Sequence, residues 1–209
     1  MAVSARLPPI FQPVAGALAG LCGYGLMMLL QQGPGAIAAL VLWTLVTLAA
    51  GERGFARWFP KLPLFGSLLA GCTVLLRWYA LISLARWPHL SPLALVAALT
   101  LGPAAMLGLA WVSRPADERA LSRLAPLTTT QALVAVGEGI LAALLCGVRI
   151  GTVLVLTAWL LFRVVSWYVN RRFGGVRGSD LEAYRILVET AALMLISSLA
   201  GLSRVASYH

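Results

Sequence analysis

Charged side chains are scarce in this sequence. Asp, Glu, Lys and Arg make up 11% of its 209 residues, whereas a soluble domain carries about 25%. The apolar and aromatic residues together with cysteine reach 60%, which excludes a water-soluble globular domain and a disordered chain. No charge occurs from Leu7 to Gly51, a stretch long enough for two bilayer crossings at about 20 residues each. We therefore expect a polytopic membrane protein that forms one integral-membrane domain over residues 1–209.

Cysteine and histidine are also few, and they form no ligand pattern. Cys22, Cys72 and Cys146 lie in separate apolar runs without a CxxC pair, which is typical of small buried hydrophobic side chains. His89 and His209 are too far apart in sequence to suggest a metal-ligand cluster. Lysine occurs once, so arginine supplies almost all of the formal charge of +9. Arginine in short loops orients membrane proteins, so we expect the lipid bilayer, and no nucleic acid, as a partner.

Apolar segments separated by Gly and Pro turns predict an all-α bundle of about seven transmembrane helices. The second segment is short for a span. We expect the first to be retained, rather than cleaved as a signal peptide, because further crossings follow it. The segments are Phe11–Leu30, Gly35–Ala50, Leu62–Ala85, Leu90–Val112, Leu127–Val148, Gly151–Val169 and Ala183–Leu202.

Basic residues are distributed unevenly between the two ends of these segments. If the connections alternate between the two sides of the membrane, eleven Lys and Arg residues fall on one side and three on the other. The richer side is cytoplasmic by the positive-inside rule, which places the N-terminus in the cytoplasm and the C-terminus outside. The eleven are Arg6, Arg53, Arg57, Lys61, Arg114, Arg119, Arg123, Arg171, Arg172, Arg177 and Arg185, and the three are Arg86, Arg149 and Arg204.

Three charged residues fall inside the expected spans, namely Arg77, Glu138 and Arg163. Charges in lipid are costly and usually face a partner or a wet cavity. Glu138 lies near the middle of its segment and cannot reach an interface, so we expect it to pair with Arg77 or Arg163. Arg163 also lies close enough to the cytoplasmic end to extend to the interface instead. Whether the pair is structural or lines a site stays open.

The segment from Arg171 to Glu182 contains the pattern most suggestive of ligand binding. Gly175 and Gly178 permit a tight turn that opens onto the start of the last helix, and helix N-termini favour phosphate. Arg171 and Arg177 add charges suited to phosphate or diphosphate. Alternatively, Ser179 and Glu182 form a capping box and the arginines only determine topology.

Further polar residues lie on the same side. Arg185 and Glu189 share a helix face with Glu182 and are either an ion pair or the wall of a polar site just under the membrane surface. Residues 51–58 lie on this side too, as does Ser113–Leu124, which we expect to be a short interfacial amphipathic helix. Together these basic regions predict an opening at the cytoplasmic face of the protein, which would favour an anionic, phosphorylated ligand.

These residues resemble a known family. Residues 174–178, followed by Leu181, Ala183 and Glu189, are similar to the Gly-Gly-x-Thr-Gly-Asp signature of the cobalamin synthases, the adenosylcobinamide-GDP ribazoletransferases. Residues 61–66, leading to Arg77 and Trp78, resemble the family's basic-x-Gly-x-Phe-Gly element and its following helix. Residues 13–25 resemble its first helix, and Leu101 and Gly102 with Met106 a later one.

The resemblance implies a multi-pass protein of the inner membrane. It implies joining of a GDP-activated corrinoid to α-ribazole or its phosphate, with release of GMP, and other membrane proteins of the cobalamin pathway as possible partners. It also implies Mg²⁺ as cofactor and acidic catalytic residues, here Glu189, Asp180 and Glu52, with Glu189 and Asp180 as metal ligands.

The sequence departs from the family pattern at several acidic positions. The family's Asp-Gly-x-Ala-Asp element reads Arg53-Gly54-Phe55-Ala56-Arg57 here, and a family glutamate position reads Ile186. In the C-terminal signature, Arg177 replaces threonine and Ser179 replaces aspartate, with Asp180 displaced by one.

Two alternatives to the transferase therefore stay open. One is a catalytically degenerate relative that binds a phosphorylated lipid, a metabolite or a partner enzyme. The other is a small transporter whose pathway charges are Arg77, Glu138 and Arg163.

Overall fold

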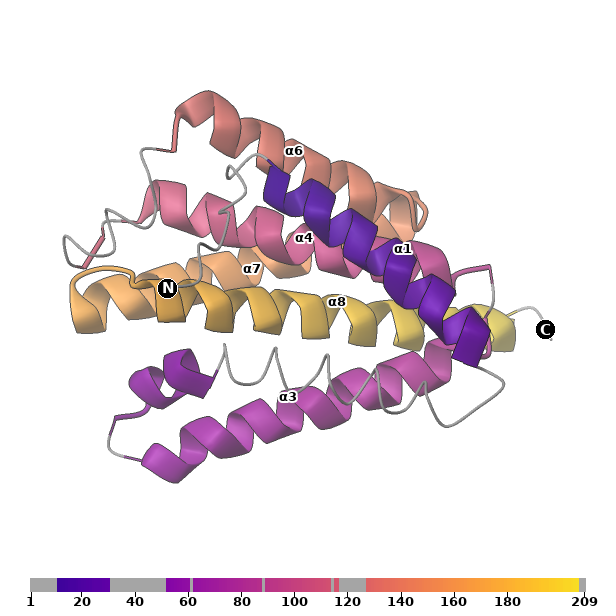
Figure 1. Cartoon of the computed structure of the whole chain (residues 1–209), viewed down its shortest axis with the longest axis horizontal. Helices are drawn as coiled ribbons and strands as arrows, with labels where there is room; N and C mark the ends of the chain where they lie inside the picture. The colour runs from indigo at the N-terminus through magenta and orange to yellow at the C-terminus, as the bar shows by residue number, and fades with distance from the viewer. Residues whose placement is uncertain are drawn as a thin grey trace.

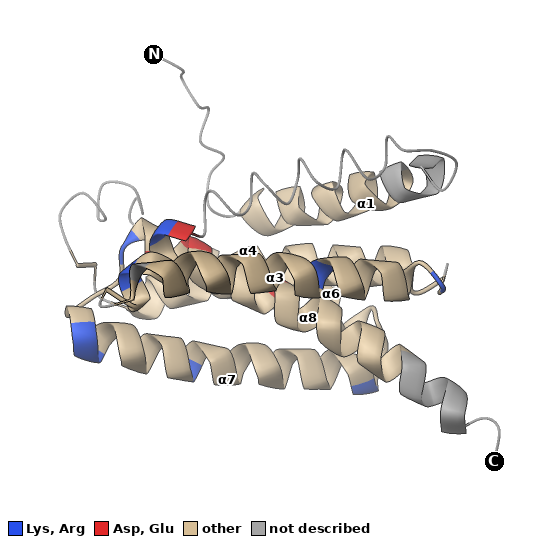
Figure 2. Ribbon diagram, turned by 90° about the horizontal axis from the view of Figure 1, so that it is seen from below, with Lys and Arg blue, Asp and Glu red and all other residues tan. Residues whose placement is uncertain are grey.

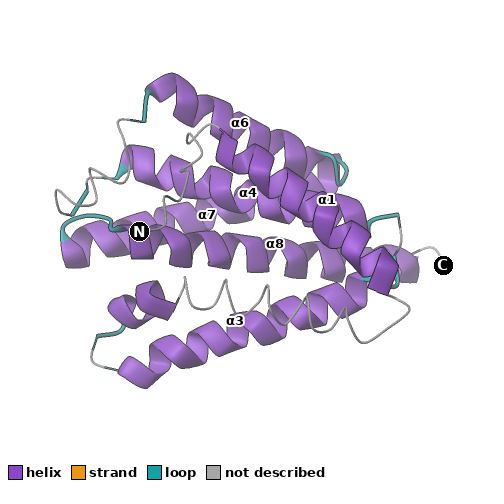
Figure 3. Ribbon diagram, viewed as in Figure 1, coloured by secondary structure: helices purple, strands orange, loops and turns teal. Residues whose placement is uncertain are grey.

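The computed structural model describes residues 11–30, 52–60, 62–87, 89–113, 115–116 and 127–206. Within these ranges all regular structure is helical, apart from one isolated β-bridge between Pro115 and Val176 (Figures 1 and 3). A short helix covers residues 52–58. The long helices are α1 (Gln12–Leu30), α3 (Pro63–Leu84), α4 (Ser91–Val112), α6 (Thr129–Leu144), α7 (Val148–Phe173) and α8 (Gly178–Ala206).

Six of the seven predicted apolar segments are helices in the structure. The second segment, Gly35–Ala50, and most of the expected interfacial helix Ser113–Leu124 lie outside the described residues. The largest boundary difference is in α8, which begins at Gly178 rather than at Ala183. Hydropathy misses this first turn because it is polar, and the same reason explains why α7 continues past Val169 to Phe173.

The described helices are those of a membrane-type protein. Four contain a segment long and apolar enough to cross a bilayer: Leu64–Leu84, Ser91–Val112, Val148–Phe173 and Gly178–Ala200. Large apolar side chains cover the outside of α7, including Trp159, Leu160 and Trp167, which are each about 60% exposed. Monomeric soluble proteins rarely expose apolar surface so extensively, so we assign this surface to lipid.

Helices α4 and α8 form the centre of the bundle. Helix α4 packs against α1, α6 and α8, while α3 packs mainly against α8. Figure 1 shows α3 on one side of this central pair and α6 on the other, and Figure 2 places α1 and α7 on opposite faces. Small residues allow the close crossings: a Cβ on Gly139 would lie 2.5 Å from the Cβ of Ala104. Such contacts are the usual basis of helix packing in lipid.

Several connecting segments meet at one end of the bundle. The hydroxyl of Tyr168, near the end of α7, donates to the carbonyl of Trp58. Ala116 donates its backbone N–H to Val176, which lies between α7 and α8 (3.1 Å). Figure 2 shows charged segments concentrated at this end. The short helix 52–58 and the turn between α7 and α8 therefore lie at the same end of the bundle, as the sequence predicts.

Candidate functional site

Asp180 joins the short helix 52–58 to the start of α8. Its carboxylate is fully buried and forms an ion pair with Arg57. It also accepts hydrogen bonds from the indole N–H of Trp58 (3.1 Å) and the backbone N–H of Arg177 (2.9 Å). Gly54 permits this contact, because a Cβ there would overlap the carbonyl of Ser179. Asp180 thus fixes the short helix and the turn before α8 in one arrangement.

The contact from Asp180 to the N–H of Arg177 replaces the capping box suggested by the sequence. Asp180 is the third residue of α8, and a carboxylate at this position can return to the N–H of the capping residue. Glu182 instead lies 3.3 Å from Nη1 of Arg185, measured from its Oε2. The alternative in which Ser179 and Glu182 start the helix is therefore wrong.

A second carboxylate, Glu189, is buried between two arginines. Its Oε2 accepts a hydrogen bond from Nη2 of Arg77 (2.9 Å), and its Oε1 lies 3.1 Å from Nε of Arg185. Arg77 is 1% exposed and also donates to the hydroxyl of Thr190 (2.8 Å) and the carbonyl of Ile186 (3.0 Å). This network ties α3 to α8 in the inner part of the bundle.

The expected pairing of Glu138 with Arg77 is wrong, because Arg77 binds Glu189. The physical reason is the packing order: α3 lies against α8, whereas α6, which carries Glu138, lies against α4. Oε2 of Glu138 is buried without a hydrogen-bond partner among the described residues. Arg163 is exposed on α7 and has no ion pair within the described ranges, so the structure does not show the alternative pair with Glu138 either.

A cavity of about 340 Å³ lies between α1, α4 and α8. Its polar wall contains Glu182, Arg185 and Glu189, the three residues that the sequence places on one helix face. We call it the α1/α4/α8 cavity. The described residues that line it are Gln12, Ala15, Gly16, Ala19, Leu99, Pro103, Met106, Glu182, Arg185 and Glu189.

The glycine-rich turn lies next to this wall. Gly174 ends α7 in the left-handed conformation (φ 68°), which a side chain rarely adopts. Gly175 is buried and Gly178 opens α8. Arg177 is exposed, and Arg171 is exposed with its guanidinium 5.3 Å from the centre of the Trp167 ring. Arg177 is thus exposed directly before α8, and Arg171 is exposed near the end of α7.

The acids that the resemblance assigns to magnesium do not form a metal site in the described part of the chain. No group of three or more His, Cys, Asp or Glu side chains lies together there. Asp180 and Glu189 are engaged by guanidinium groups, and Glu52 is exposed and accepts a hydrogen bond from Ser67 (2.7 Å). Mg²⁺ requires carboxylate or other oxygen ligands, and neighbouring arginines repel it. These residues do not fit the ion, and we derive no step through it.

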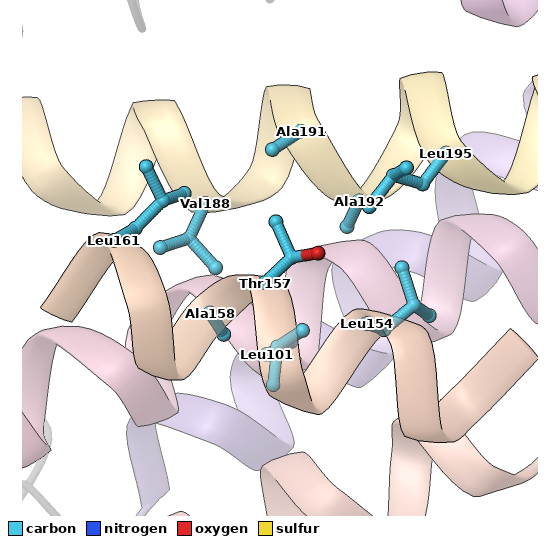
Figure 4. Close-up of a pocket in the computed structure, with 9 residues that line it drawn as sticks. All are labelled: Leu101, Leu154, Thr157, Ala158, Leu161, Val188, Ala191, Ala192 and Leu195. Atoms are coloured by element: carbon cyan, nitrogen blue, oxygen red, sulfur yellow. The ribbon is translucent and has the colours of Figure 1, made fainter.

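The contact between helices α4, α7 and α8 is a packing contact rather than a ligand site. Figure 4 shows side chains of α4, α7 and α8 that converge on it, of which only Thr157 carries a polar group. The space between them does not admit a water-sized molecule. It has neither the volume nor the polar groups of a ligand site.

Sequence reasoning missed several residues that complete these networks. Trp58 and Thr190 supply hydrogen bonds to Asp180 and Arg77, and Gln12 lines the cavity from α1. Gly102 on α4 is required beside Glu189, because a Cβ there would overlap the glutamate side chain. Only Gly102 carried a signal, since it lies in a stretch that resembles a family helix.

A family model described as cobalamin-5-phosphate synthase matches residues 62–197. The match covers more than half of the chain and includes α3, α4, α6, α7 and most of α8, with the glycine-rich turn, Glu182, Arg185 and Glu189. It begins after the short helix that carries Arg53 and Arg57. No curated protein and no solved structure matches the chain. The extent of the match, together with the motifs of the last turn and helix, shows that the chain belongs to the cobalamin-5-phosphate synthase family.

Proposed function

We propose that this protein joins a GDP-activated corrinoid to α-ribazole, or to its phosphate, and releases GMP. The observation that carries the proposal is the position of the α1/α4/α8 cavity. It is lined by the first turns of α8, directly after the turn that bears Arg177, and both lie within the region matched by the family model. The cavity and the exposed Arg177 are thus connected through the start of one helix, α8.

We place this chemistry at the inner membrane. The charge asymmetry of the sequence supports seven crossings with a cytoplasmic N-terminus. The end where helix 52–58 meets α7 and α8 is then the cytoplasmic end, where water-soluble nucleotides are available. Other membrane proteins of the same pathway are proposed partners at this end.

The residues support phosphoryl transfer as follows. A ribose hydroxyl attacks the corrinoid-side phosphorus of the diphosphate, a new P–O bond forms, and the bond to GMP breaks. In this proposal Arg171 and Arg177, both exposed, neutralise phosphate charge. Of the three proposed catalytic acids, only Glu189 lines the cavity. Asp180 positions the turn, and Glu52 lies on the exposed side of the short helix.

A specific observation favours a second candidate, a family member that binds without turnover. The ion pairs of Asp180 with Arg57, and of Glu189 with Arg77 and Arg185, leave neither carboxylate unengaged for metal or proton transfer. Such a protein would bind a phosphorylated metabolite or lipid, or a partner enzyme, at the same cytoplasmic opening. A transport role gains no such support, because Arg77 is tied to α8 and Arg163 faces outward.

The test is GMP release by the full chain in lipid nanodiscs, supplied with GDP-activated corrinoid and α-ribazole. The assay is run with Mg²⁺ and with EDTA. The transferase predicts GMP release that falls at least tenfold in Arg177→Ala and persists in Arg163→Ala, a matched change at an exposed arginine. Binding of the GDP-corrinoid without GMP release supports the second candidate. Neither binding nor release would contradict both.

A further inference from the structure

The α1/α4/α8 cavity combines an apolar wall with polar groups that lack hydrogen bonds. Its apolar side consists of alanine, leucine, proline and methionine side chains from α1 and α4. On the other side, Oε1 of Gln12 is buried without a hydrogen-bond partner in the described part of the chain. Oε2 of Glu182 forms an ion pair with Nη1 of Arg185 (3.3 Å) but no hydrogen bond among the described residues. Buried polar atoms without partners are rare and call for an explanation. A bound molecule with hydroxyl or N–H groups would provide one.

The charges in the cavity argue against an anion. Two carboxylates, Glu182 and Glu189, face it with one guanidinium, Arg185. Arg77 is on the far side of Glu189 and is 1% exposed, so its charge is already matched by that carboxylate. With Glu189 paired with Arg77, Glu182 and Arg185 balance each other, so the described lining offers a phosphate no net positive charge. The exposed arginines of the neighbouring turn are the better place for phosphate.

A hydroxyl group fits the polar wall better than a simple donor or acceptor. Nε of Arg185 is also buried without a hydrogen bond, although it lies 3.1 Å from Oε1 of Glu189. The wall thus offers both acceptors and a donor, and a hydroxyl can satisfy both kinds. The volume of about 340 Å³ is at the small end of the range of small-molecule sites.

We infer that the α1/α4/α8 cavity binds an uncharged, nucleoside-sized molecule that carries hydroxyl groups on one side and an apolar or aromatic face on the other. The hydroxyls donate to Gln12 and Glu182, and the apolar face lies against Leu99, Pro103 and Met106. The identification of this molecule with α-ribazole, the phosphate-free acceptor, rests on the proposed function. The binding itself does not require turnover.

The experiment measures binding of uncharged nucleosides, α-ribazole and adenosine, to the full chain in nanodiscs by equilibrium dialysis. Ala19→Leu places a larger side chain in the cavity, whereas Cys22→Leu alters an exposed residue of α1 outside it. We expect Ala19→Leu to weaken nucleoside binding at least tenfold and Cys22→Leu to leave it unchanged. Gln12→Leu should weaken it about three- to tenfold, the value of one neutral hydrogen bond. Inorganic pyrophosphate should not displace the nucleoside.

The outcomes separate this inference from the proposed function. Nucleoside binding that is lost in Ala19→Leu, in a chain that never releases GMP, supports the cavity site and contradicts the transferase. GMP release with an unchanged KM for α-ribazole in Ala19→Leu supports the transferase and overturns the cavity site. Equal losses in Ala19→Leu and Cys22→Leu, displacement by pyrophosphate, or no nucleoside binding by the wild-type chain would also overturn it. Gln12→Leu tests the same site should Ala19→Leu fail to fold.

Discussion

Replacing Glu189 by glutamine should strongly destabilise the protein. The change keeps the size of the side chain and one hydrogen-bond acceptor but removes the charge between Arg77 and Arg185. Arg77 is 1% exposed and Glu189 2% exposed, so the contact between them is well shielded from bulk water. The buried guanidinium of Arg77 then loses its ion pair with Glu189, and removing one partner of a buried ion pair is strongly destabilising.

The magnitude follows from the geometry. At the 2.9 Å that separate Nη2 of Arg77 from Oε2 of Glu189, and an effective dielectric constant of about 20, the attraction is about 6 kcal/mol. Desolvation offsets part of it, and removing one partner of a buried pair costs about 3–5 kcal/mol. For a chain of this size that corresponds to a fall in Tm of about 6–20 °C.

The assay is thermal unfolding of the purified protein in detergent. Glu182→Gln is the matched control, because Glu182 pairs with Arg185 at 3.3 Å with both side chains about one third exposed. Such a pair contributes at most about 1 kcal/mol, so Tm should fall by no more than about 4 °C. In Arg77→Gln/Glu189→Gln the loss should be smaller than the sum of the two single losses. Equal Tm values for Glu189→Gln and Glu182→Gln, or additive losses, would refute the buried pair.

Three further predictions follow from the structure. Gly102→Ala should displace the side chain of Glu189 and lower Tm. Gly137→Ala should not lower Tm, because its new Cβ would have no neighbour within 4 Å among the described residues. Thermal unfolding of both variants checks this. Cys146 is buried whereas Cys22 and Cys72 are exposed, so N-ethylmaleimide should label Cys146 far more slowly than the other two in the detergent-solubilised protein. Arg177→Ala should weaken binding of inorganic pyrophosphate, measured by dialysis at low and high salt, and an unchanged affinity would remove the phosphate-binding turn.

The sequence predicts the helices well because lipid imposes one strong signal, a long apolar run, on each span. It also predicts the polar wall of the cavity, since residues 182, 185 and 189 share a face of any regular helix. The partner of Arg77 could not be predicted in this way. Pairing depends on which helices are neighbours, and apolar helices of similar composition give no information on their order. Glu138 was therefore the plausible partner from the sequence, and Glu189 is the observed one.

The departures from the family pattern are connected by the structure. Considered separately, Arg57 in place of a family carboxylate and Asp180 displaced by one position look like two losses. In the structure these two side chains form an ion pair, and Trp58 and the backbone of Arg177 complete the hydrogen bonds of Asp180. Arg57 thus supplies the positive charge that balances the buried carboxylate of Asp180. The turn before α8 is therefore held by contacts within the chain.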